Sequence, residues 1–242
     1  MPELREELGL HGVVANAENS APTGRGITPK SGAALLSVAD FLTLGNHAFD
    51  AEGYEEFLQA EERVVRPANF DGGSPGRGWG LFETDGVRVG VVNVLGRVFI
   101  ERTRISAFEA VDWAVAGLED AGADLVLVDA HAEATSEKQA LGHHLAGRAQ
   151  AVLGTHTHVP TADASVLPGG TAYATDVGMT GCKDSIIGFD REDFLGLFLG
   201  EGRRGVSVAV HGLVVFNGVV VDIELDGRRA VGIEPVRREW TP

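Results

Sequence analysis

Four short apolar runs, each followed by residues able to bind a metal ion, constrain the fold of this chain most strongly. The runs cover residues 11–17, 41–44, 124–129 and 151–153, with helical patterns between them. This alternation predicts an α/β fold in which the carboxyl ends of several strands meet at one edge of a sheet. Side chains far apart in the sequence are then expected to lie together, namely Glu18, Asn19, Asn46, His47, His131, His156 and His158.

The segment from Gly154 to Pro160, Gly-Thr-His-Thr-His-Val-Pro, carries two of these histidines at positions i and i+2. Residues two apart on a strand share one face, and histidine is the commonest metal ligand in proteins. The pair therefore favours half of a metal site. The alternative is a polar loop with two surface histidines.

The candidate ligands combine carboxylate, carboxamide and imidazole groups. Such nitrogen and oxygen ligands suit manganese, iron or zinc. The chain has one cysteine, Cys182, which argues against a closed structural zinc site and against a disulfide framework. Mixed ligands around open positions suit a two-metal hydrolytic site. Glu18 is the acid best placed at a strand end to bridge two ions.

Each candidate also has a simpler interpretation. Asn46 after Gly45 is typical of a turn, His47 is able to cap the following turn, and His131 is able to serve as a hydrogen-bonded core histidine. His143 and His144 fall in a predicted helix and are assigned to its surface or packing. The coincidence of four strand ends, rather than any single residue, favours the metal site.

Composition narrows the class of protein. The length of 242 residues, with 44% hydrophobic and 23% charged residues, predicts one domain spanning residues 1–242. The net charge of -15 argues against non-specific binding to long nucleic acids. The sequence shows neither an apolar run long enough to span a membrane nor a signal peptide. We therefore expect a cytoplasmic protein without membrane contact, and a homo-oligomer is left open.

Local patterns predict several turns and caps. Asp-Gly and Asn-Gly pairs between apolar runs favour hairpins at Asp85-Gly86, Asn217-Gly218 and Asp226-Gly227. Asp50 is expected to cap the helix that carries Tyr54. The chain after Pro160 is rich in β-type residues and is expected to be mainly antiparallel.

The residues quoted above resemble a known family. Gly45-Asn46-His47 and Gly154-Thr155-His156-Thr157-His158 are similar to two blocks of calcineurin-like metallophosphoesterases. Asn16 to Ser20 and His131 to Lys138 resemble the YmdB-like bacterial branch, described as 2′,3′-cyclic-nucleotide phosphodiesterases. The resemblance extends from about Met1 to the C-terminus. It implies a four-layer αββα fold, which is a mixed-sheet β-sandwich flanked by helices.

The resemblance also implies roles for the candidate residues. Glu18 would bridge two metal ions, most often iron in this branch, with manganese or zinc as alternatives. Asn19 and His158 would bind the first ion, and the remaining ligands, Asn46, His131 and His156, would bind the second. A hydroxide bridging the ions would attack phosphorus, and His47 would protonate the leaving oxygen. The implied substrate is a small phosphodiester or a cyclic nucleotide.

One block of the family pattern is absent from the printed sequence. Relatives begin with an apolar strand ending in Gly-Asp-Val-x-Gly, and its Asp binds the first ion. We therefore expect a missing first strand, reduced stability, a weak first site and metal retained better near His156 than near His158. An alternative function is a metal-binding regulatory or scaffold protein with weakened catalysis. A metal-dependent amidohydrolase is disfavoured, because its His pair follows the first strand of a barrel.

Overall fold

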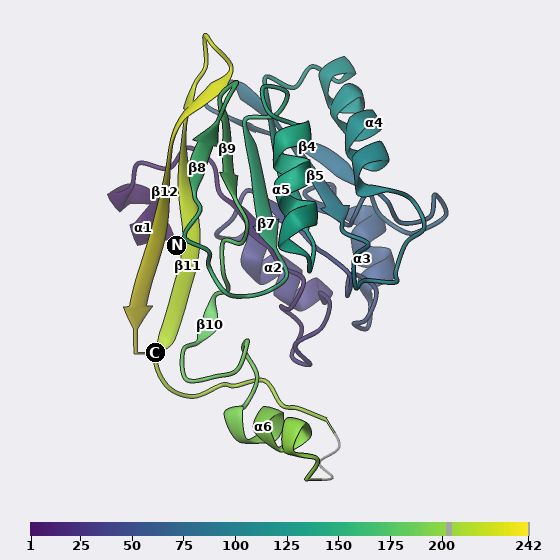
Figure 1. The fold of residues 1–242 in the computed structure, drawn as a ribbon, viewed down its shortest axis with the longest axis vertical. Coiled ribbons are helices and arrows are strands. Elements are labelled where there is room, and N and C mark those ends of the chain that lie inside the picture. Colours follow the sequence, from purple (N-terminus) through teal and green to yellow (C-terminus); the bar gives the residue numbers. More distant parts are fainter. Residues whose placement is uncertain (202–204, 242) are drawn as a thin grey trace.

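The computed structural model describes residues 1–201 and 205–241, and its strands form three sheets (Figure 1). A three-stranded parallel sheet contains β1 (Val14–Asn16), β2 (Phe41–Thr43) and β3 (Val64–Val65). A six-stranded mixed sheet has the order β4-β5-β6-β7-β9-β8, from β4 (Trp79–Thr84), β5 (Val87–Leu95), β6 (Leu125–His131), β7 (Ala151–Thr155), β9 (Thr171–Ala174) and β8 (Ser165–Leu167). An antiparallel sheet contains β10 (Gly181–Cys182), β11 (Val214–Glu224) and β12 (Arg229–Trp240).

Six helices accompany the sheets in the described part of the chain. They are α1 (Pro2–Glu7), α2 (Pro29–Leu36), α3 (Tyr54–Ala60), α4 (Ala107–Asp120), α5 (Thr135–His144) and α6 (Arg191–Leu199). Helices α4 and α5 lie against the six-stranded sheet, whereas α6 stands apart near β10 (Figure 1). Within the part of the chain that the structure describes, we find no helix with the length and apolarity that a membrane crossing requires.

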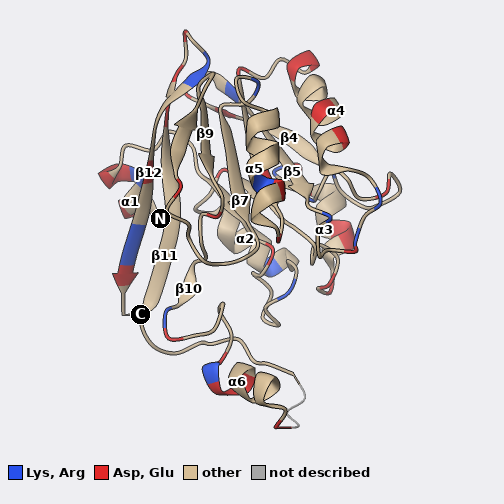
Figure 2. Cartoon of the chain, viewed as in Figure 1, with Lys and Arg blue, Asp and Glu red and all other residues tan. Residues whose placement is uncertain are grey.

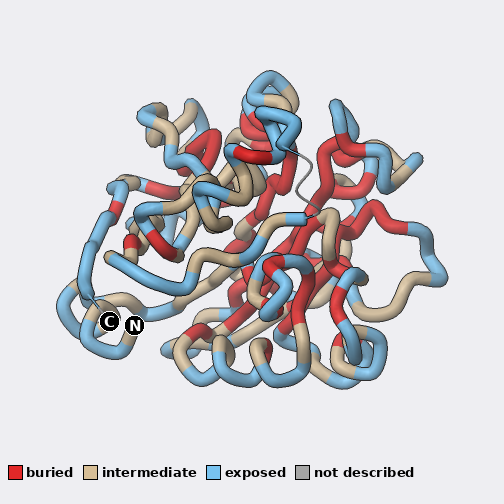
Figure 3. The backbone as a smooth tube through the Cα atoms, turned by 90° about the horizontal axis from the view of Figure 1, so that it is seen from below, coloured by how far each residue is buried: buried red, intermediate tan, exposed pale blue. Residues whose placement is uncertain are grey.

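The buried side chains define four layers. Val111 and Leu118 of α4 pack on Val92 and Val126 of the six-stranded sheet. On the other side, Leu58 of α3 joins a second apolar cluster with the β1–β3 sheet. Between the sheets, Phe41 and Val65 contact Val91, and Ala151 and Ala172 contact Ala230. The predicted αββα arrangement is therefore confirmed, with the buried backbone gathered in the middle of the molecule (Figure 3).

Local sequence explains how two of these elements begin. The Thr28 hydroxyl accepts the backbone N–H of Ser31, and the Ser31 hydroxyl accepts that of Thr28, which forms a capping box at the start of α2. Between β4 and β5, Asp85 and Gly86 have φ values of 50° and 78°. Two positive φ values match the tight turn that favours Asp-Gly, so this predicted hairpin is confirmed.

Two of the other predicted features are wrong. Asn217-Gly218 lies inside β11, paired with Arg237 and Val236, because the Asn217 side chain donates to the carbonyl of Met179 instead of forming a turn. Helix α3 begins after Gly53, so Asp50 does not cap it. The hairpin at Asp226-Gly227 is confirmed, since β11 and β12 flank it.

A large apolar cavity lies between β1, the six-stranded sheet and β11. Its volume is about 1780 Å³, and its lining includes Ala15, Leu127, Leu153 and Val219. Among the described residues, β1 pairs with β2 along one edge and with no strand along the other. The expectation of a missing strand stays a prediction, and this unpaired edge is consistent with it.

Acidic residues are spread over the molecule. Figure 2 shows them on α3, α4 and α6 as well as in loops, interspersed with Lys and Arg. The chain has 35 acidic and 20 basic residues, and the acidic residues are not confined to one element.

Candidate metal centre

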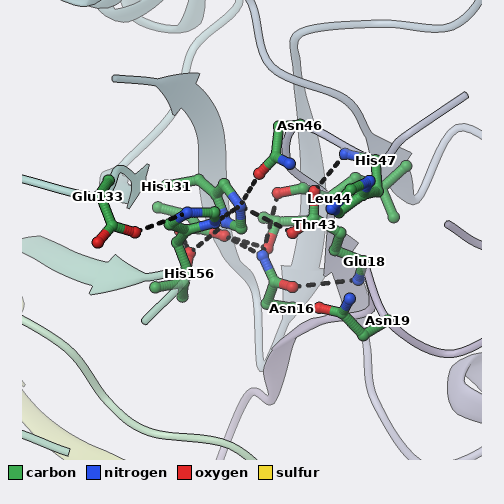
Figure 4. A network of polar contacts seen from close by, with 12 residues as sticks. Asn16, Glu18, Asn19, Thr43, Leu44, Asn46, His47, His131, Glu133 and His156 are labelled. Atoms are coloured by element: carbon green, nitrogen blue, oxygen red, sulfur yellow. Dashed lines mark hydrogen bonds and ion pairs between the residues drawn. The ribbon is translucent and has the colours of Figure 1, made fainter. Parts of the chain in front are cut away.

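Three of the predicted ligands converge where strands β1, β6 and β7 end. Glu18 follows β1, His131 ends β6 and His156 follows β7. Their ligand atoms all lie within 4.8 Å of one another. The side chains of Glu18 and His131 are each 1% exposed, and that of His156 is partly buried (Figure 4). This convergence follows from the parallel strands, whose carboxyl ends lie side by side.

The Nε2 atom of His131 is the centre of this cluster. It lies 2.7 Å from Oε2 of Glu18, 3.0 Å from Oδ1 of Asn46 and 3.0 Å from Nδ1 of His156. A single ring nitrogen carries at most one proton, so it cannot satisfy three neighbouring lone pairs by donation. A cation among these four groups satisfies all of them at once. Two imidazole nitrogens, a carboxylate and an amide oxygen form a donor set that fits manganese, iron or zinc.

Hydrogen bonds behind His131 fix which of its nitrogens faces the cluster. Its Nδ1 lies 2.8 Å from the Thr155 hydroxyl, which donates to Oδ1 of Asp129 at 2.6 Å. Because that hydroxyl has given its one proton to the carboxylate, its oxygen accepts N–H from Nδ1. Nε2 is therefore the ring nitrogen that faces the cluster, and it offers a lone pair to a metal ion once its proton is lost. Asp129 also accepts hydrogen bonds from Asn16 and Thr43.

His156 is oriented in a similar way from outside. Its Nε2 lies 3.0 Å from Oε2 of Glu133, so Nδ1 faces His131. A metal-binding histidine commonly donates its second ring N–H to a carboxylate or another acceptor. Glu133 accepts this N–H from His156 directly, whereas Asp129 supports His131 through the hydroxyl of Thr155. Sequence reasoning does not assign Glu133, Thr155 or Asp129 to the site, although each lies within two positions of a predicted histidine ligand.

The charges in the cluster favour metal binding. Burial raises the pKa of Glu18, but the charge of His131 and the hydrogen bond to it outweigh burial and lower that pKa. Burial lowers the pKa of His131, whereas Glu18 and Asp129 outweigh burial and raise it. Burial and the charge of His131 lower the pKa of His156 to about 4. At neutral pH Glu18 is ionised and His156 is neutral, as metal binding requires.

The loop after β2 brings Asn46 and His47 to the same place. A Cβ atom on Gly45 would lie 2.2 Å from Nε2 of His131 and 2.4 Å from Oε1 of Glu18. Glycine is therefore required for this close approach. The backbone N–H of His47 donates to Oε1 of Glu18 at 2.6 Å. This bond joins the loop to the cluster.

The ring of His47 is held from its far side. Its Nδ1 lies 2.6 Å from Oδ2 of Asp50, which also forms a 3.4 Å ion pair with Arg102. Asp50 therefore orients this histidine instead of capping a helix. The contact with Asp50 involves Nδ1, and the charge of the His47 ring acts on Glu18 and helps to lower the pKa of that carboxyl.

His158 is not one of the three residues whose ligand atoms lie within 4.8 Å of one another, and both it and Asn19 contact backbone carbonyls. The Asn19 amide donates to the carbonyl of Gly24 at 2.7 Å, and Nδ1 of His158 lies 2.7 Å from the carbonyl of Ile187. The structure thus brings together the residues expected around the second ion, while the contacts of Asn19 and His158 with these carbonyls involve Nδ2 and Nδ1 rather than Oδ1 and Nε2. The individual roles of all seven residues stay predictions.

Residues 1–236 match a protein family described as YmdB-like protein. The chain belongs to the YmdB-like family. The resemblance found in the sequence is thereby confirmed.

Relatives of this chain cover nearly its whole length. A Bacillus subtilis (strain 168) protein named 2′,3′-cyclic-nucleotide 2′-phosphodiesterase is 41% identical over 98% of this chain and 88% of its own length. A crystal structure of a hypothetical protein from Thermus thermophilus is 45% identical, with a TM-score of 0.89 over 98% of this chain and 90% of that one. A Mycoplasma pneumoniae protein described as a novel phosphatase is 30% identical, with a TM-score of 0.89 over 100% of this chain and 87% of that one.

These similarities agree with the architecture described above. The α/β fold, with mixed sheets flanked by helices, is the fold of the family. The family contains phosphodiesterase and phosphatase hydrolases, so the chain is a member of a hydrolase family.

Proposed function

We propose that this chain is a metal-dependent phosphodiesterase that hydrolyses small phosphodiesters such as 2′,3′-cyclic nucleotides. The observation that carries the proposal is the convergence of Glu18, Asn46, His131 and His156 beside the ring of His47. The name of the Bacillus subtilis relative supports the substrate class.

The cluster supports an assignment of the metal ligands. Asn46, His131 and His156 would hold one ion, Asn19 and His158 would hold a second, and Glu18 would serve both. Iron is the proposed metal, with manganese and zinc as alternatives of the same donor preference. When bound, such ions neutralise charge on the phosphate and lower the pKa of water at the site.

The chain itself supplies the proton for the leaving group. Asp50 contacts Nδ1 of His47, so Nε2 is the ring nitrogen that would face a substrate. Nε2 would transfer its proton to the departing ribose oxygen. The bond from the His47 N–H to Glu18 keeps this acid beside the residues that hold the phosphate.

A comparison of two substrates tests this assignment. We expect Mn²⁺- or Fe²⁺-loaded protein to hydrolyse both 2′,3′-cyclic AMP and bis(p-nitrophenyl) phosphate. His47→Asn is expected to lower kcat on the cyclic nucleotide by about 10²–10⁴-fold, the usual contribution of general acid catalysis. The loss on the nitrophenyl ester is smaller, because nitrophenolate leaves without a proton.

The exposed helix residue His143 offers a matched control. His143→Asn changes the same side chain away from the cluster and is expected to leave both rates unchanged. Folded, metal-loaded wild-type protein that turns over neither substrate would contradict the proposal. An equal loss on both substrates in His47→Asn would contradict the role of His47.

The positions of Asn19 and His158 favour a second candidate function. Because His158 lies outside the converging group and Asn19 donates to a backbone carbonyl, a metal-binding regulatory or scaffold protein with weakened catalysis is the alternative. Metal content discriminates between the two. Two ions per chain favour the enzyme, whereas one ion without turnover favours the scaffold protein.

A further inference from the structure

A second buried polar cluster lies next to the metal centre. Nζ of Lys138, in α5, is 2.8 Å from Oδ2 of Asp176, which follows β9, and the two side chains are 0% and 1% exposed. A buried ion pair loses the hydration of both charges, so its presence is weak evidence for a gain in stability. The other contacts of this ion pair indicate a second role.

Asp176 directs its carboxylate at the loop that carries the two histidines. Its Oδ2 accepts the backbone N–H of Thr157 at 3.0 Å and the Thr157 hydroxyl at 2.8 Å. Its Oδ1 accepts the N–H of Gly178 at 2.9 Å. Thr157 stands between His156 and His158, so the carboxylate holds the middle residue of the His-Thr-His segment.

Both histidines of this segment have a conformation that costs energy. The φ values are 96° at His156 and 68° at His158, in the left-handed region that residues other than glycine rarely occupy. Such strain persists only where the surrounding structure fixes it. The N–H and hydroxyl of Thr157, which both end on Asp176, fix the residue between the two strained positions.

Backbone contacts align the same two segments. Val177 N–H donates to the carbonyl of Gly154 at 3.0 Å, and Met179 N–H donates to the carbonyl of His158 at 3.1 Å. A Cβ atom on Gly154 would lie 1.7 Å from the carbonyl oxygen of Thr175 and 2.9 Å from Cδ of Lys138. The absence of a side chain at Gly154 lets the Lys138 stem pass against β7 and reach Asp176.

We propose that Lys138 and Asp176 are positioning residues for the metal centre, acting through Thr157 to hold the turn that directs His156 at His131. Lys138 keeps the carboxylate of Asp176 in place, and the carboxylate anchors Thr157. This inference rests on the metal centre of the proposed function and is independent of the substrate.

Removal of one hydroxyl tests the link. Thr157→Val keeps the shape of the side chain but loses its bond to Asp176, and Thr157→Ser restores a hydroxyl. We expect Thr157→Val to weaken Mn²⁺ binding about tenfold, as changes behind metal ligands commonly do, and Thr157→Ser to bind like wild type. Isothermal titration with Mn²⁺ measures both, without reference to activity.

Thr171 provides the matched control. Its buried hydroxyl donates to the carbonyl of Ala149 at 2.6 Å, in a part of β9 that does not contact the His-Thr-His segment. Thr171→Val therefore lowers stability, measured by urea unfolding, and leaves Mn²⁺ affinity unchanged. A loss of Mn²⁺ affinity in Thr171→Val equal to that in Thr157→Val would overturn the proposal, because the effect would then be one of stability.

A double variant tests the ion pair itself. Lys138→Met with Asp176→Asn removes both charges together and leaves no buried ion without a partner. We expect this variant to fold and to bind Mn²⁺ about tenfold more weakly than wild type.

His156→Ala separates failure of this inference from failure of the metal centre. If Thr157→Val binds Mn²⁺ as tightly as wild type while His156→Ala does not, the positioning role is wrong and the metal centre stands. If His156→Ala also binds normally, the metal centre itself is wrong.

Discussion

The two buried polar clusters near the end of β7 are satisfied in opposite ways. Around Lys138 and Asp176, the ammonium group, the N–H and hydroxyl of Thr157 and the N–H of Gly178 all donate to the Asp176 carboxylate, and the two charges are of opposite sign. Around His131, the lone pairs of Glu18, Asn46 and His156 converge on one nitrogen that carries at most one proton. The first cluster is complete in charge as it stands, whereas the second would be completed by a cation. Burial alone therefore does not identify a functional site, but the balance of donors and acceptors does.

The largest expected effect comes from breaking the complete cluster. Lys138→Met alone leaves Asp176 as a buried charge without its ionic partner, and we expect a loss of about 3–5 kcal/mol in the free energy of unfolding. Glu18→Gln in metal-free protein should cost less, below about 2 kcal/mol, because His131 is able to release its proton when its partner is neutralised. Urea unfolding in the presence of a chelator measures both. Equal losses would contradict the contrast between the clusters.

Breaking the incomplete cluster should affect metal binding instead. His156→Ala removes a nitrogen from the converging group. We expect Mn²⁺ affinity to fall by about 100-fold or more, because loss of a residue that only supports a ligand already costs up to about 100-fold. His158→Ala should have a smaller effect, because that ring lies outside the group.

Thermal unfolding with added Mn²⁺ checks this second prediction. At a concentration of 100 times its Kd, a ligand stabilises the folded state by about 2.7 kcal/mol. This gain should be present in wild type and His158→Ala and lost in His156→Ala at the same concentration. Equal losses in the two variants would show that the two histidines are equivalent ligands.

The pH dependence of metal binding follows from the raised pKa of His131. In metal-free protein this raised pKa stabilises the fold below the ordinary value of about 6.5, and the gain is lost as pH rises through the folded-state pKa. A metal ion must displace the same proton. Mn²⁺ affinity should therefore rise with pH, by up to about tenfold per unit, until His131 is neutral.

Proton release checks the sign of this effect. Calorimetric titration in two buffers of different ionisation enthalpy should show up to one proton released per ion below the pKa of His131. His156, whose pKa is lowered to about 4, should contribute no proton near neutral pH. Proton uptake on metal binding would contradict this account of the cluster.

Strand ends made much of this site predictable from sequence. Glu18, Asn46, His131 and His156 were expected to meet because parallel strands carry their carboxyl ends to one edge of a sheet. For Asn19 and His158, which also follow strands, the ligand role stays a prediction, and one side-chain nitrogen of each contacts the carbonyl of Gly24 or Ile187. Proximity to a strand end thus predicts the neighbourhood of a side chain, and local backbone geometry decides its direction.

The residues that support the histidine ligands could not be predicted from the positions of strand ends. Asp129 reaches His131 through Thr155, which depends on the register between β6 and β7 that pairs His131 with Thr155. Most lysines lie on the surface of a protein, yet Gly154 leaves the space that buries Lys138. The predicted turn at Asn217-Gly218 is wrong for a similar reason, since the Asn217 side chain donates to the distant carbonyl of Met179. Each of these depends on a contact between segments that no local pattern specifies.

The residues that hydrogen-bond the two histidine ligands from behind give the smallest expected effects on metal affinity. Thr155→Val cuts the buried connection from Asp129 to His131, and we expect Mn²⁺ affinity to fall about tenfold. Glu133→Gln should cost less than about threefold, because the Glu133 side chain is 47% exposed and water screens or replaces its contact with His156. Isothermal titration with Mn²⁺ ranks the two variants. If Glu133→Gln proves the more damaging, burial is not what gives a supporting carboxylate its influence, and the charge nearest the ligand decides instead.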